Sequence, residues 1–270
     1  MSGKHFLYLL FSRYLGIFTI IFLLLFLNNC SKKSNETAST GRLKIQFAIQ
    51  VDENDLIYNQ LLYSNAAGNQ YEVREVKFFV SDFIFYSHTG NRVKITSHNG
   101  VHYYDSNIES TYLWDIFDKI PTETYDSVSF IFGLVPERNV TGSFPNPPEN
   151  LMAWPEVLGG GYHYMQINGK WLNQYDSLMP FNLHTGIGQL RQDGQIYDFV
   201  HNQFQVTLPL SSFKIKDKQI QKLVLVMNVN QWFNSPNVFD FNYYGGAIMQ
   251  NQEAQQVLKE NGHNVFTAHF

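Results

Sequence analysis

The sequence is poor in cysteine, because Cys30 is the only one among its 270 residues. A single cysteine cannot form a disulfide within the chain, so a packed core has to hold the fold. Charged residues are also scarce, at 16% of the chain, which equals the aromatic share. This aromatic-rich and charge-poor composition favours a β protein with a sizeable core.

Several sequence patterns that mark enzymes are absent. There is no Gly-x-Ser-x-Gly elbow, no Gly-x-Gly-x-x-Gly after a strand, no P-loop and no His-Glu-x-x-His. The three glycines 159–161 do not lie between a strand and a helix, so they do not indicate phosphate binding. A tight turn that enters a strand explains them better. We therefore expect a protein that is not an enzyme.

The N-terminal segment has the features of an export signal. Lys4 and Arg13 precede an uncharged apolar run over residues 15–27. A helix needs about 20 apolar residues to span a bilayer, and this run has 13. The length therefore predicts a cleavable signal peptide over residues 1–29 rather than a permanent anchor.

Cys30 follows directly, in the order Leu27, Asn28, Asn29 and Cys30. This resembles a bacterial lipobox, although asparagine stands where a small residue is usual. A buried free thiol is the alternative to lipidation. Lipidation predicts a lipoprotein anchored to the bacterial cell envelope, in the periplasm or at the outer membrane. Residues 30–41 then form a polar tether, and residues 42–270 the folded domain.

The mature chain is acidic. Removing residues 1–29 takes away two basic residues and no acidic one, which leaves 17 basic and 23 acidic residues and a formal charge of −6. That charge argues against nucleic acid as a partner and against electrostatic binding to anionic lipid. No repeat or strong linker divides the 241 residues that remain, so one domain is the simpler interpretation.

Alternation of apolar and polar residues predicts strands at several places. It is clearest from Leu43 to Ile49, while residues 71–86 predict a strand pair or one bent strand. Residues 223–229 are apolar almost throughout and predict a central strand. Helices are expected only over 112–117 and 251–260. The pattern is typical of an all-β sandwich or barrel.

Side chains that bind metals gather in one region. Trp154, three glycines, His163 and Met165 lie within twelve residues, and His184 follows on the next predicted strand. Imidazole and thioether are metal ligands, and the soft thioether favours copper(I). A regular strand over 162–168 would place His163 and Met165 on one face.

His184 on an adjacent strand would then lie about 5 Å from His163, close enough to share one ion. The alternative is that the two histidines form hydrogen bonds inside a barrel mouth and bind no metal.

Nine short segments of the sequence occur in an order that resembles a known protein family. They are Leu43–Val51, Tyr71–Phe83, His102–Asp105, Met152–Pro155, Gly159–Met165, Phe181–Gly186, Met227–Phe233, Ile248–Met249 and Asn261–Phe266. This order resembles the MbnP-like family of copper-binding exported proteins, in its lipoprotein branch. The resemblance implies an immunoglobulin-like antiparallel β-sandwich with one or two short helices, and a role in copper handling.

The resemblance also implies particular residues. By position, His163 and His184 match the motif histidines. Trp154 corresponds to a tryptophan that a partner haem enzyme of the di-haem peroxidase type can oxidise to kynurenine. Glu156 departs from the pattern, because a second tryptophan is absent two places after Trp154.

Two weaker ligand candidates complete the predicted metal site. They are His102, for which a structural role is the alternative, and Met165, for which burial in the core is the alternative.

Two classes of function follow from the sequence. The first is an exported, membrane-tethered protein that captures or hands on copper without catalytic turnover. The second is a surface lipoprotein that binds no metal and recognises a glycan or a partner protein through an aromatic-rich face.

Overall fold

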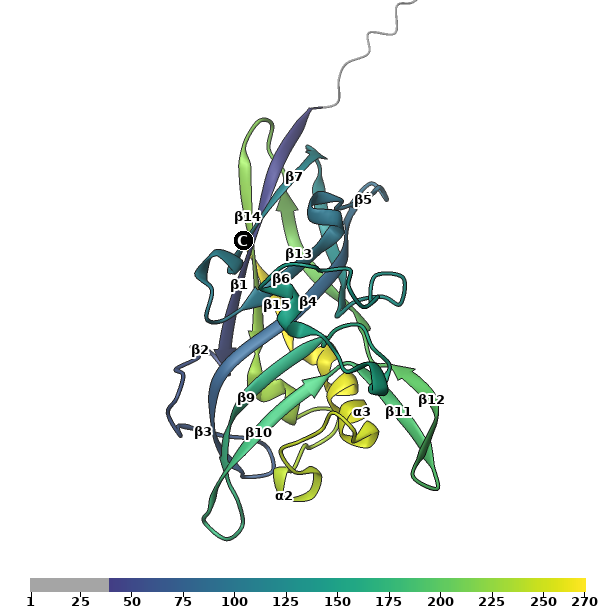
Figure 1. Cartoon of the computed structure of the whole chain (residues 1–270). Coiled ribbons are helices and arrows are strands. Elements are labelled where there is room, and N and C mark those ends of the chain that lie inside the picture. Colours follow the sequence, from purple (N-terminus) through teal and green to yellow (C-terminus); the bar gives the residue numbers. More distant parts are fainter. Residues whose placement is uncertain (1–38) are drawn as a thin grey trace, which may run out of the picture. The chain divides into compact units, whose positions relative to one another are not determined.

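Two β-sheets that pack face to face make up most of the folded part of the chain (Figure 1). The computed structural model describes residues 39–270. In the first sheet the strand order is β15-β14-β1-β2, and β7 also pairs with β1. The bounds of these strands are β1 Thr40–Val51, β2 Asn54–Asp55, β7 Leu113–Pro121, β14 Ile220–Asn228 and β15 Phe266–His269.

The second sheet has the order β10-β9-β4-β8-β13, and β3, β5 and β6 pair with β4 as well. Its strands are β3 Tyr63–Ser64, β4 Gln70–Ser87, β5 Arg92–Lys94, β6 Val101–Asp105, β8 Thr124–Phe132, β9 Met165–Leu172, β10 Leu178–Thr185 and β13 Phe204–Lys214. A separate hairpin joins β11 Ile187–Gln192 to β12 Gln195–His201. The predicted all-β sandwich is confirmed.

The alternation that predicted β1 also determines its packing. Leu43, Ile45 and Phe47 are buried between the sheets, whereas the residues between them are partly exposed or exposed. β14 lies between β15 and β1, which confirms the predicted central strand. Its pairing with β1 is parallel, so the sandwich is antiparallel with this exception among the strand pairs of residues 39–270.

The long apolar segment before residue 87 is a single bent strand, β4. Its pairing changes from β9 to β8 along its length, and the register with β8 shifts between Ser81 and Ile84. Asp82, inside this bulge, has a φ of 53°. Its carboxylate accepts two hydrogen bonds from the guanidinium of Arg138, at 3.1 and 3.2 Å, and lies 2.8 Å from Nζ of Lys94.

Within residues 39–270, helices are few and short, as predicted. They are α2 Phe241–Tyr244 and α3 Gln252–Asn261, together with the 3₁₀ turns η1 Ser97–Gly100, η2 Glu109–Thr111, η3 Glu149–Met152, η4 Glu156–Leu158, η5 Val229–Phe233 and η6 Gly262–Asn264. The side chain of Asn251 caps α3 by accepting a hydrogen bond from the backbone of Ala254. The helix predicted over 112–117 is wrong. Trp114 and Ile116 alternate into the core as part of β7 instead.

Two apolar clusters lie on opposite faces of the second sheet. Phe78 and Met165 belong to the inner core between the sheets, whereas their neighbours Phe79 and Tyr164 belong to a smaller cluster on the outer face. We call the latter the outer cluster. Its buried members are Phe79, Val101, Tyr103, Leu134, Met152, Trp154, Leu158, Tyr162, Tyr164 and Ile187.

The predicted signal peptide, Cys30 and the predicted tether up to residue 38 lie outside the described residues. β1 begins at Thr40, two residues before the predicted start of the folded domain. Within residues 39–270, no helix is both long and apolar enough to cross a membrane.

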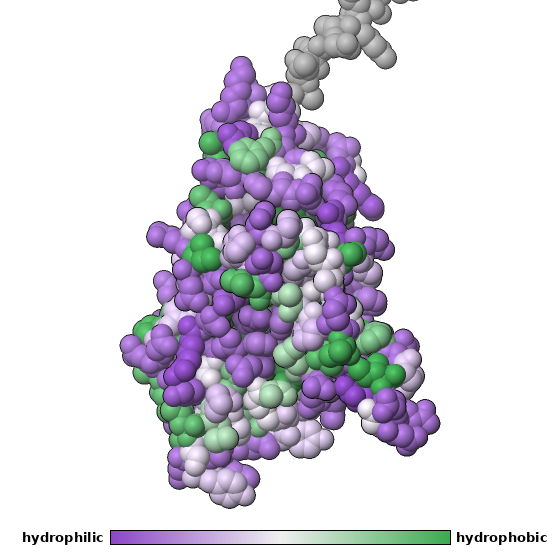
Figure 2. All heavy atoms as spheres, in the orientation of Figure 1, coloured by the Kyte–Doolittle hydropathy of each residue, from purple (hydrophilic) through white to green (hydrophobic). Residues whose placement is uncertain are grey.

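The aromatic content is used mainly inside the molecule. All four tryptophans are buried, and so are most of the phenylalanines among residues 39–270. The face in Figure 2 is mostly hydrophilic, with a few separate apolar patches. Packing therefore explains the aromatic-rich composition, and a broad aromatic binding face is not needed to account for it.

Candidate metal centre

The three glycines form the turn that was expected from the sequence. Gly159, Gly160 and Gly161 have φ values of 114°, 67° and 79°, a region that glycine adopts without strain. The loop after β8, residues 133–148, lies over the outer cluster and holds this turn. The side chain of Asn139 in this loop accepts a hydrogen bond from the backbone of Tyr162 at 2.8 Å. The turn folds the chain back so that residues 152–154 lie beside residues 161–163.

His163 is oriented by the backbone of Met152. The carbonyl oxygen of Met152 accepts a hydrogen bond from the backbone N–H of His163 at 2.7 Å and lies 2.9 Å from its Nδ1. A carbonyl can only accept, so Nδ1 carries the proton and Nε2 presents a lone pair. This Nε2 is buried and has no hydrogen-bond partner among residues 39–270.

His184 lies on β10, directly opposite Gln166 of β9, and therefore on the outer face of the sheet. Its Nε2 lies 2.8 Å from Oδ1 of Asn168. The amide nitrogen of Asn168 donates to Glu75, so its oxygen is left as the acceptor and Nε2 of His184 carries the proton. The other nitrogen, Nδ1, is a buried lone pair that no group in the described part of the chain satisfies.

The two imidazole rings meet. Their centroids are 5.0 Å apart and their planes are nearly perpendicular, at 86°. The indole of Trp154 lies against His163 with a centroid distance of 4.7 Å, and its Nε1 donates to the carbonyl of Leu158. The structure thus brings together three of the residues that the sequence had singled out.

Burial keeps both imidazoles neutral. It lowers the pKa of His163 against the opposing effect of the Met152 carbonyl. Burial, and next the nearby His163, lower the pKa of His184 to about 4. Near neutral pH both rings therefore offer unprotonated nitrogens, which is the form that binds metals.

An acidic residue, Glu75, contacts the Asn168 side chain that is hydrogen-bonded to His184. Glu75 accepts from Asn168 at 2.5 Å and lies 2.8 Å from Nζ of Lys77. Burial alone would raise the pKa of Glu75, but the hydrogen bonds from Lys77 and Asn168 outweigh it and lower that pKa. Glu75 thus orients Asn168, which in turn orients His184, and hydrogen bonds of this kind hold ligand histidines in place in metal sites. The sequence did not reveal Asn168 or Glu75 as part of such a site, because their roles depend on strand register.

Met165 does not join the pair. β9 begins only at Met165, so residues 162–164 do not follow the regular alternation that placed His163 and Met165 on one face. The predicted shared face is therefore wrong. Met165 is fully buried in the inner core, on the face of β9 opposite to the residue that pairs with His184.

His102 is also placed elsewhere. Its ring stacks between Phe47, at 4.8 Å, and Trp114, at 5.3 Å, and its Nε2 lies 2.8 Å from the carbonyl of Thr111. Burial lowers its pKa to about 4. The next residue, Tyr103, belongs to the outer cluster, so His102 faces the other side of the sheet and away from His184.

No group of three or more His, Cys, Asp or Glu side chains is arranged to hold a metal ion within residues 39–270. The paired histidines therefore offer two nitrogen atoms as possible metal ligands. Two buried lone pairs with no hydrogen-bond donor cost free energy unless something satisfies them, and a metal ion would satisfy both.

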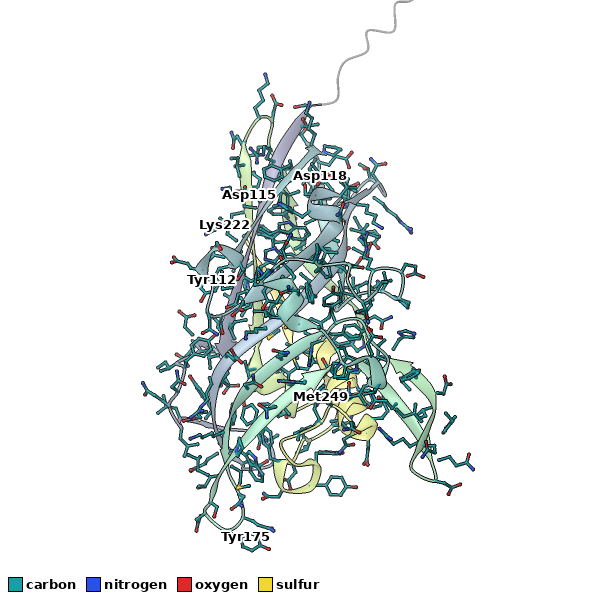
Figure 3. All side chains as sticks on the ribbon, viewed as in Figure 1. Tyr112, Asp115, Asp118, Tyr175, Lys222 and Met249 are labelled. Atoms are coloured by element: carbon teal, nitrogen blue, oxygen red, sulfur yellow. The ribbon has the colours of Figure 1, made fainter. Side chains whose placement is uncertain are left out.

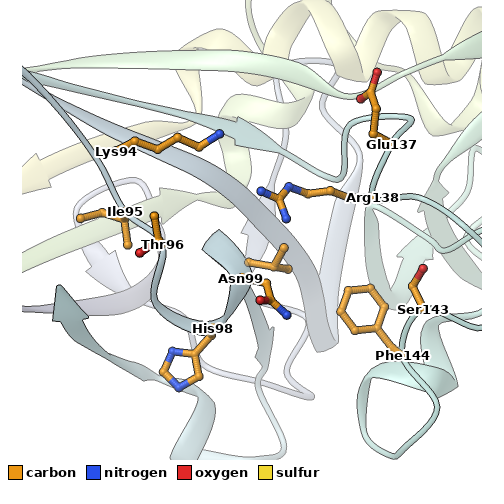
Figure 4. A pocket seen from close by; sticks show the side chains of 10 residues that line it. Lys94, Ile95, Thr96, His98, Asn99, Glu137, Arg138, Ser143 and Phe144 are labelled. Carbon is orange, nitrogen blue, oxygen red and sulfur yellow. The ribbon is translucent and has the colours of Figure 1, made fainter.

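A separate open cleft of about 460 Å³ lies near β5 and the loop after β8. Lys94 and Arg138 border it, as Figure 4 shows. Both cations are already paired with Asp82, so the cleft offers little free positive charge to an anion.

The fold and the paired imidazoles define an all-β sandwich protein that holds two buried, unpaired imidazole nitrogens side by side. The family model described as MbnP matches residues 40–250, and the chain belongs to the MbnP family. The resemblance inferred from the sequence is thereby confirmed.

Among solved structures, the chain is similar to MbnP from Methylosinus trichosporium, with a TM-score of 0.48 and 16% sequence identity. The match covers 74% of this chain and 80% of the other. No curated protein matches the chain.

Proposed function

We propose that this protein binds copper through His163 and His184 and captures or hands on the ion without catalytic turnover. The observation that carries the proposal is the pair of buried imidazole lone pairs, Nε2 of His163 and Nδ1 of His184, in rings 5.0 Å apart. The hydrogen bonds to Met152 and Asn168 fix both tautomers, so neither ring has to reorganise to bind.

The separation of the rings is compatible with one ion shared between them. A metal bonded at about 2 Å to each nitrogen would allow the ring centroids to lie up to roughly 6 Å apart. The observed 5.0 Å is within that limit, so His163 and His184 could both bind one ion without moving closer. Neutral imidazoles in an apolar cluster suit a singly charged copper(I) ion, because burying a lower charge costs less.

Copper titration of the full chain, purified in detergent, tests the proposal. We expect one equivalent of copper(I) per protein, and we expect that His163→Ala and His184→Ala each abolish tight binding. His88→Ala is the matched control, because the ring of this exposed histidine is paired with Asp126 and not with either site histidine. Full copper affinity in both site variants would contradict the assignment.

We further propose that the protein is exported and held at the cell envelope by a lipid on Cys30. The apolar run 15–27 and the cysteine after it support this. In a bacterial host, the wild type should fractionate with membranes and Cys30→Ser should be released into the soluble exported fraction. Release of both forms to the same extent would contradict the lipid anchor.

A di-haem peroxidase-type partner is proposed to act at Trp154. The indole itself is only 2% exposed, but Leu151 and Val157 on either side of it in the chain are 73% and 79% exposed. They offer an apolar contact beside the site. When the partner is co-expressed, the peptide that contains Trp154 should acquire the mass of a kynurenine residue. An unmodified peptide under those conditions would exclude this role.

A further inference from the structure

The outer face of the first sheet exposes two apolar side chains near the start of β1. Phe117 of β7 is 63% exposed, and Ile220 of β14 is 53% exposed. Arg42 lies between them, because β1 pairs with both strands and Arg42 is the register partner of Ile220. The guanidinium carbon of Arg42 lies 5.4 Å from the centroid of the Phe117 ring. Two apolar side chains and a cation thus form one exposed row.

Alternation along the strands turns these side chains outwards. Leu43 and Ile116, which neighbour Arg42 and Phe117 in the sequence, are fully buried between the sheets. Successive side chains of a strand point to opposite faces, so Arg42 and Phe117 point away from the core. The row is therefore open to a partner outside the domain.

The same end of the sandwich is rich in lysine. Three cations and no acid of the described chain line an open cleft of about 350 Å³ there, namely Arg42, Lys119 and Lys218. Residues 214–222, at the turn from β13 to β14, include four lysines and one aspartate. Figure 1 shows this turn beside the start of β1 and the end of β7. The mature chain is acidic as a whole, but its charge is unevenly distributed, and we call this region the basic end.

Four acids lie near the basic end, and each contacts a partner within the described chain. Asp115, labelled in Figure 3, lies 3.2 Å from Nζ of Lys44 and 3.8 Å from the guanidinium of Arg42. The other three, with their partners, are Asp118 with Thr96, Glu123 with Asn91, and Asp126 with His88.

The lysines of the basic end lack such partners. Lys119, Lys214 and Lys216 form no ion pair within residues 39–270. Lys218 contacts Asp217 at 3.9 Å, which is a long and exposed contact that contributes little. The positive charges of these lysines can therefore attract anions outside the domain.

We infer that the basic end docks onto a membrane surface that contains anionic phospholipids. The lysines contact the headgroup phosphates, while Phe117 and Ile220 enter the boundary between headgroups and acyl chains. The combination of exposed apolar side chains with unpaired cations favours this partner, because a membrane surface offers both apolar and anionic contacts.

The position of the basic end along the chain supports the same partner. This step rests on the proposed lipid anchor at Cys30. Ten residues, 30–39, precede Thr40, where β1 begins. A fully extended chain of ten residues reaches about 35 Å at most. A lipid on Cys30 would therefore keep the start of β1, and the basic end with it, close to the bilayer.

Docking by this face leaves the candidate metal centre accessible. The basic end exposes the outer face of the first sheet, whereas His184 lies on the outer face of the second. The inner core lies between these two faces. A domain that rests on the membrane by the first sheet therefore presents the paired histidines to the solution, where a soluble partner can reach them.

Lysine acylation tests the inference on the full chain, reconstituted in vesicles of phosphatidylcholine with or without phosphatidylglycerol. An uncharged reagent labels the lysines, and mass spectrometry measures the labelling of each. Every cation near an anionic surface favours docking by roughly fivefold, so several together should make the docked state dominant. Labelling of Lys119 and Lys214 should therefore fall about fivefold or more in the anionic vesicles. Lys170 of β9 and Lys259 of α3 should label equally in both, and high salt should abolish the difference.

Two double variants with equal loss of charge separate the basic end from the rest of the molecule. Lys216→Gln/Lys218→Gln should weaken docking by roughly 25-fold, so that labelling of Lys119 rises towards its value in neutral vesicles. Lys170→Gln/Lys259→Gln is the control and should keep Lys119 protected. Equal labelling of Lys119 in the two variants would overturn the assignment of the basic end.

The remaining outcomes distinguish this inference from the lipid anchor on which it rests. Equal labelling of Lys119 in neutral and anionic vesicles would overturn docking and leave the anchor standing. Protection that follows protein density instead of lipid charge would assign the face to a second copy of the chain and overturn docking as well. A chain that floats with anionic vesicles but not with neutral ones would refute the anchor and support the docking face.

Discussion

Gly186 and Trp154 touch so closely that no larger residue fits at position 186. A Cβ atom on Gly186 would lie 2.6 Å from Cε3 of the Trp154 ring. Gly186 follows His184 by two residues, so the indole packs against the chain at the end of β10 and also contacts His163. The space left by the missing side chain therefore determines where Trp154 lies.

Replacement of Gly186 by alanine should displace Trp154. We expect a loss of about 1–3 kcal/mol in the free energy of unfolding, which is typical of overpacking. Tryptophan fluorescence should change at the same time. Gly194→Ala is the control, because its Cβ would meet nothing within 4 Å and only its positive φ of 79° would be strained. An unchanged stability and spectrum in Gly186→Ala would contradict the steric argument.

Asn168→Ala should weaken copper binding without abolishing it. The change removes the acceptor that holds the proton on Nε2 of His184, so the ring can adopt the wrong tautomer. The loss should be on the order of 10- to 100-fold in affinity, measured by competition with a chelator of known affinity. Asn107→Ala is the control, because Asn107 donates to the other oxygen of Glu75 and does not contact His184. Equal affinities in the two variants would argue against the role of Asn168.

The copper-free protein should lose stability as the pH falls from about 6.5 to 5. The pKa values of His102 and His184 are about 4 in the folded protein, against an ordinary value of 6.5. In this window the unfolded chain binds more protons than the folded one, so acid favours unfolding. Each histidine adds a slope of up to about 1.4 kcal/mol per pH unit.

Chemical denaturation at pH 5, 6 and 7.5 measures this slope. Replacement of His102 by glutamine should reduce this slope without removing it, because the pKa values of His163 and His184 are also lowered by burial. Carboxylates with lowered pKa values, such as Glu75, change the stability mainly at pH values below this range, so they contribute little to the measured slope. A free energy of unfolding that stays the same between pH 7.5 and 5 would contradict the burial of neutral imidazoles.

Asp82→Asn should destabilise the loop over the outer cluster. Asparagine tolerates the φ of 53° at this bulge, so the backbone can persist while the charge is lost. Arg138 and Lys94 would then lose their shared carboxylate, at a cost of about 1–3 kcal/mol. Asp217→Asn is the control, since its contact with Lys218 is long and exposed. Equal unfolding midpoints for both variants would count against the bulge ion pair.

Strand positions could be predicted from the sequence where burial is one-sided. Leu43 and Phe47 alternate with polar residues because one face of β1 meets the core and the other does not. Residues 112–117 misled the prediction, because an apolar segment of that length fits a short helix or a strand equally well. Only the pairing of Leu113 and Trp114 with β1 determines that they form a strand.

The site was predictable in part. His163, His184 and Trp154 could be singled out because glycines and a family pattern mark their positions. The exclusion of Met165 depended on where regular pairing of β9 begins, which sequence periodicity does not reveal. His102 is as buried as a ligand would be, yet the alternation of β6 turns it to the other face of the sheet.

The proposed site lies on the outer cluster, whereas the inner core joins the two sheets. The proposed binding and the folding therefore depend on largely different side chains. A relative could lose both histidines and still fold as this sandwich, so the fold alone does not guarantee the function. Conversely, a new donor set could arise beneath the same loop at little cost to stability. The sandwich can thus serve as a stable scaffold on which metal preference changes separately.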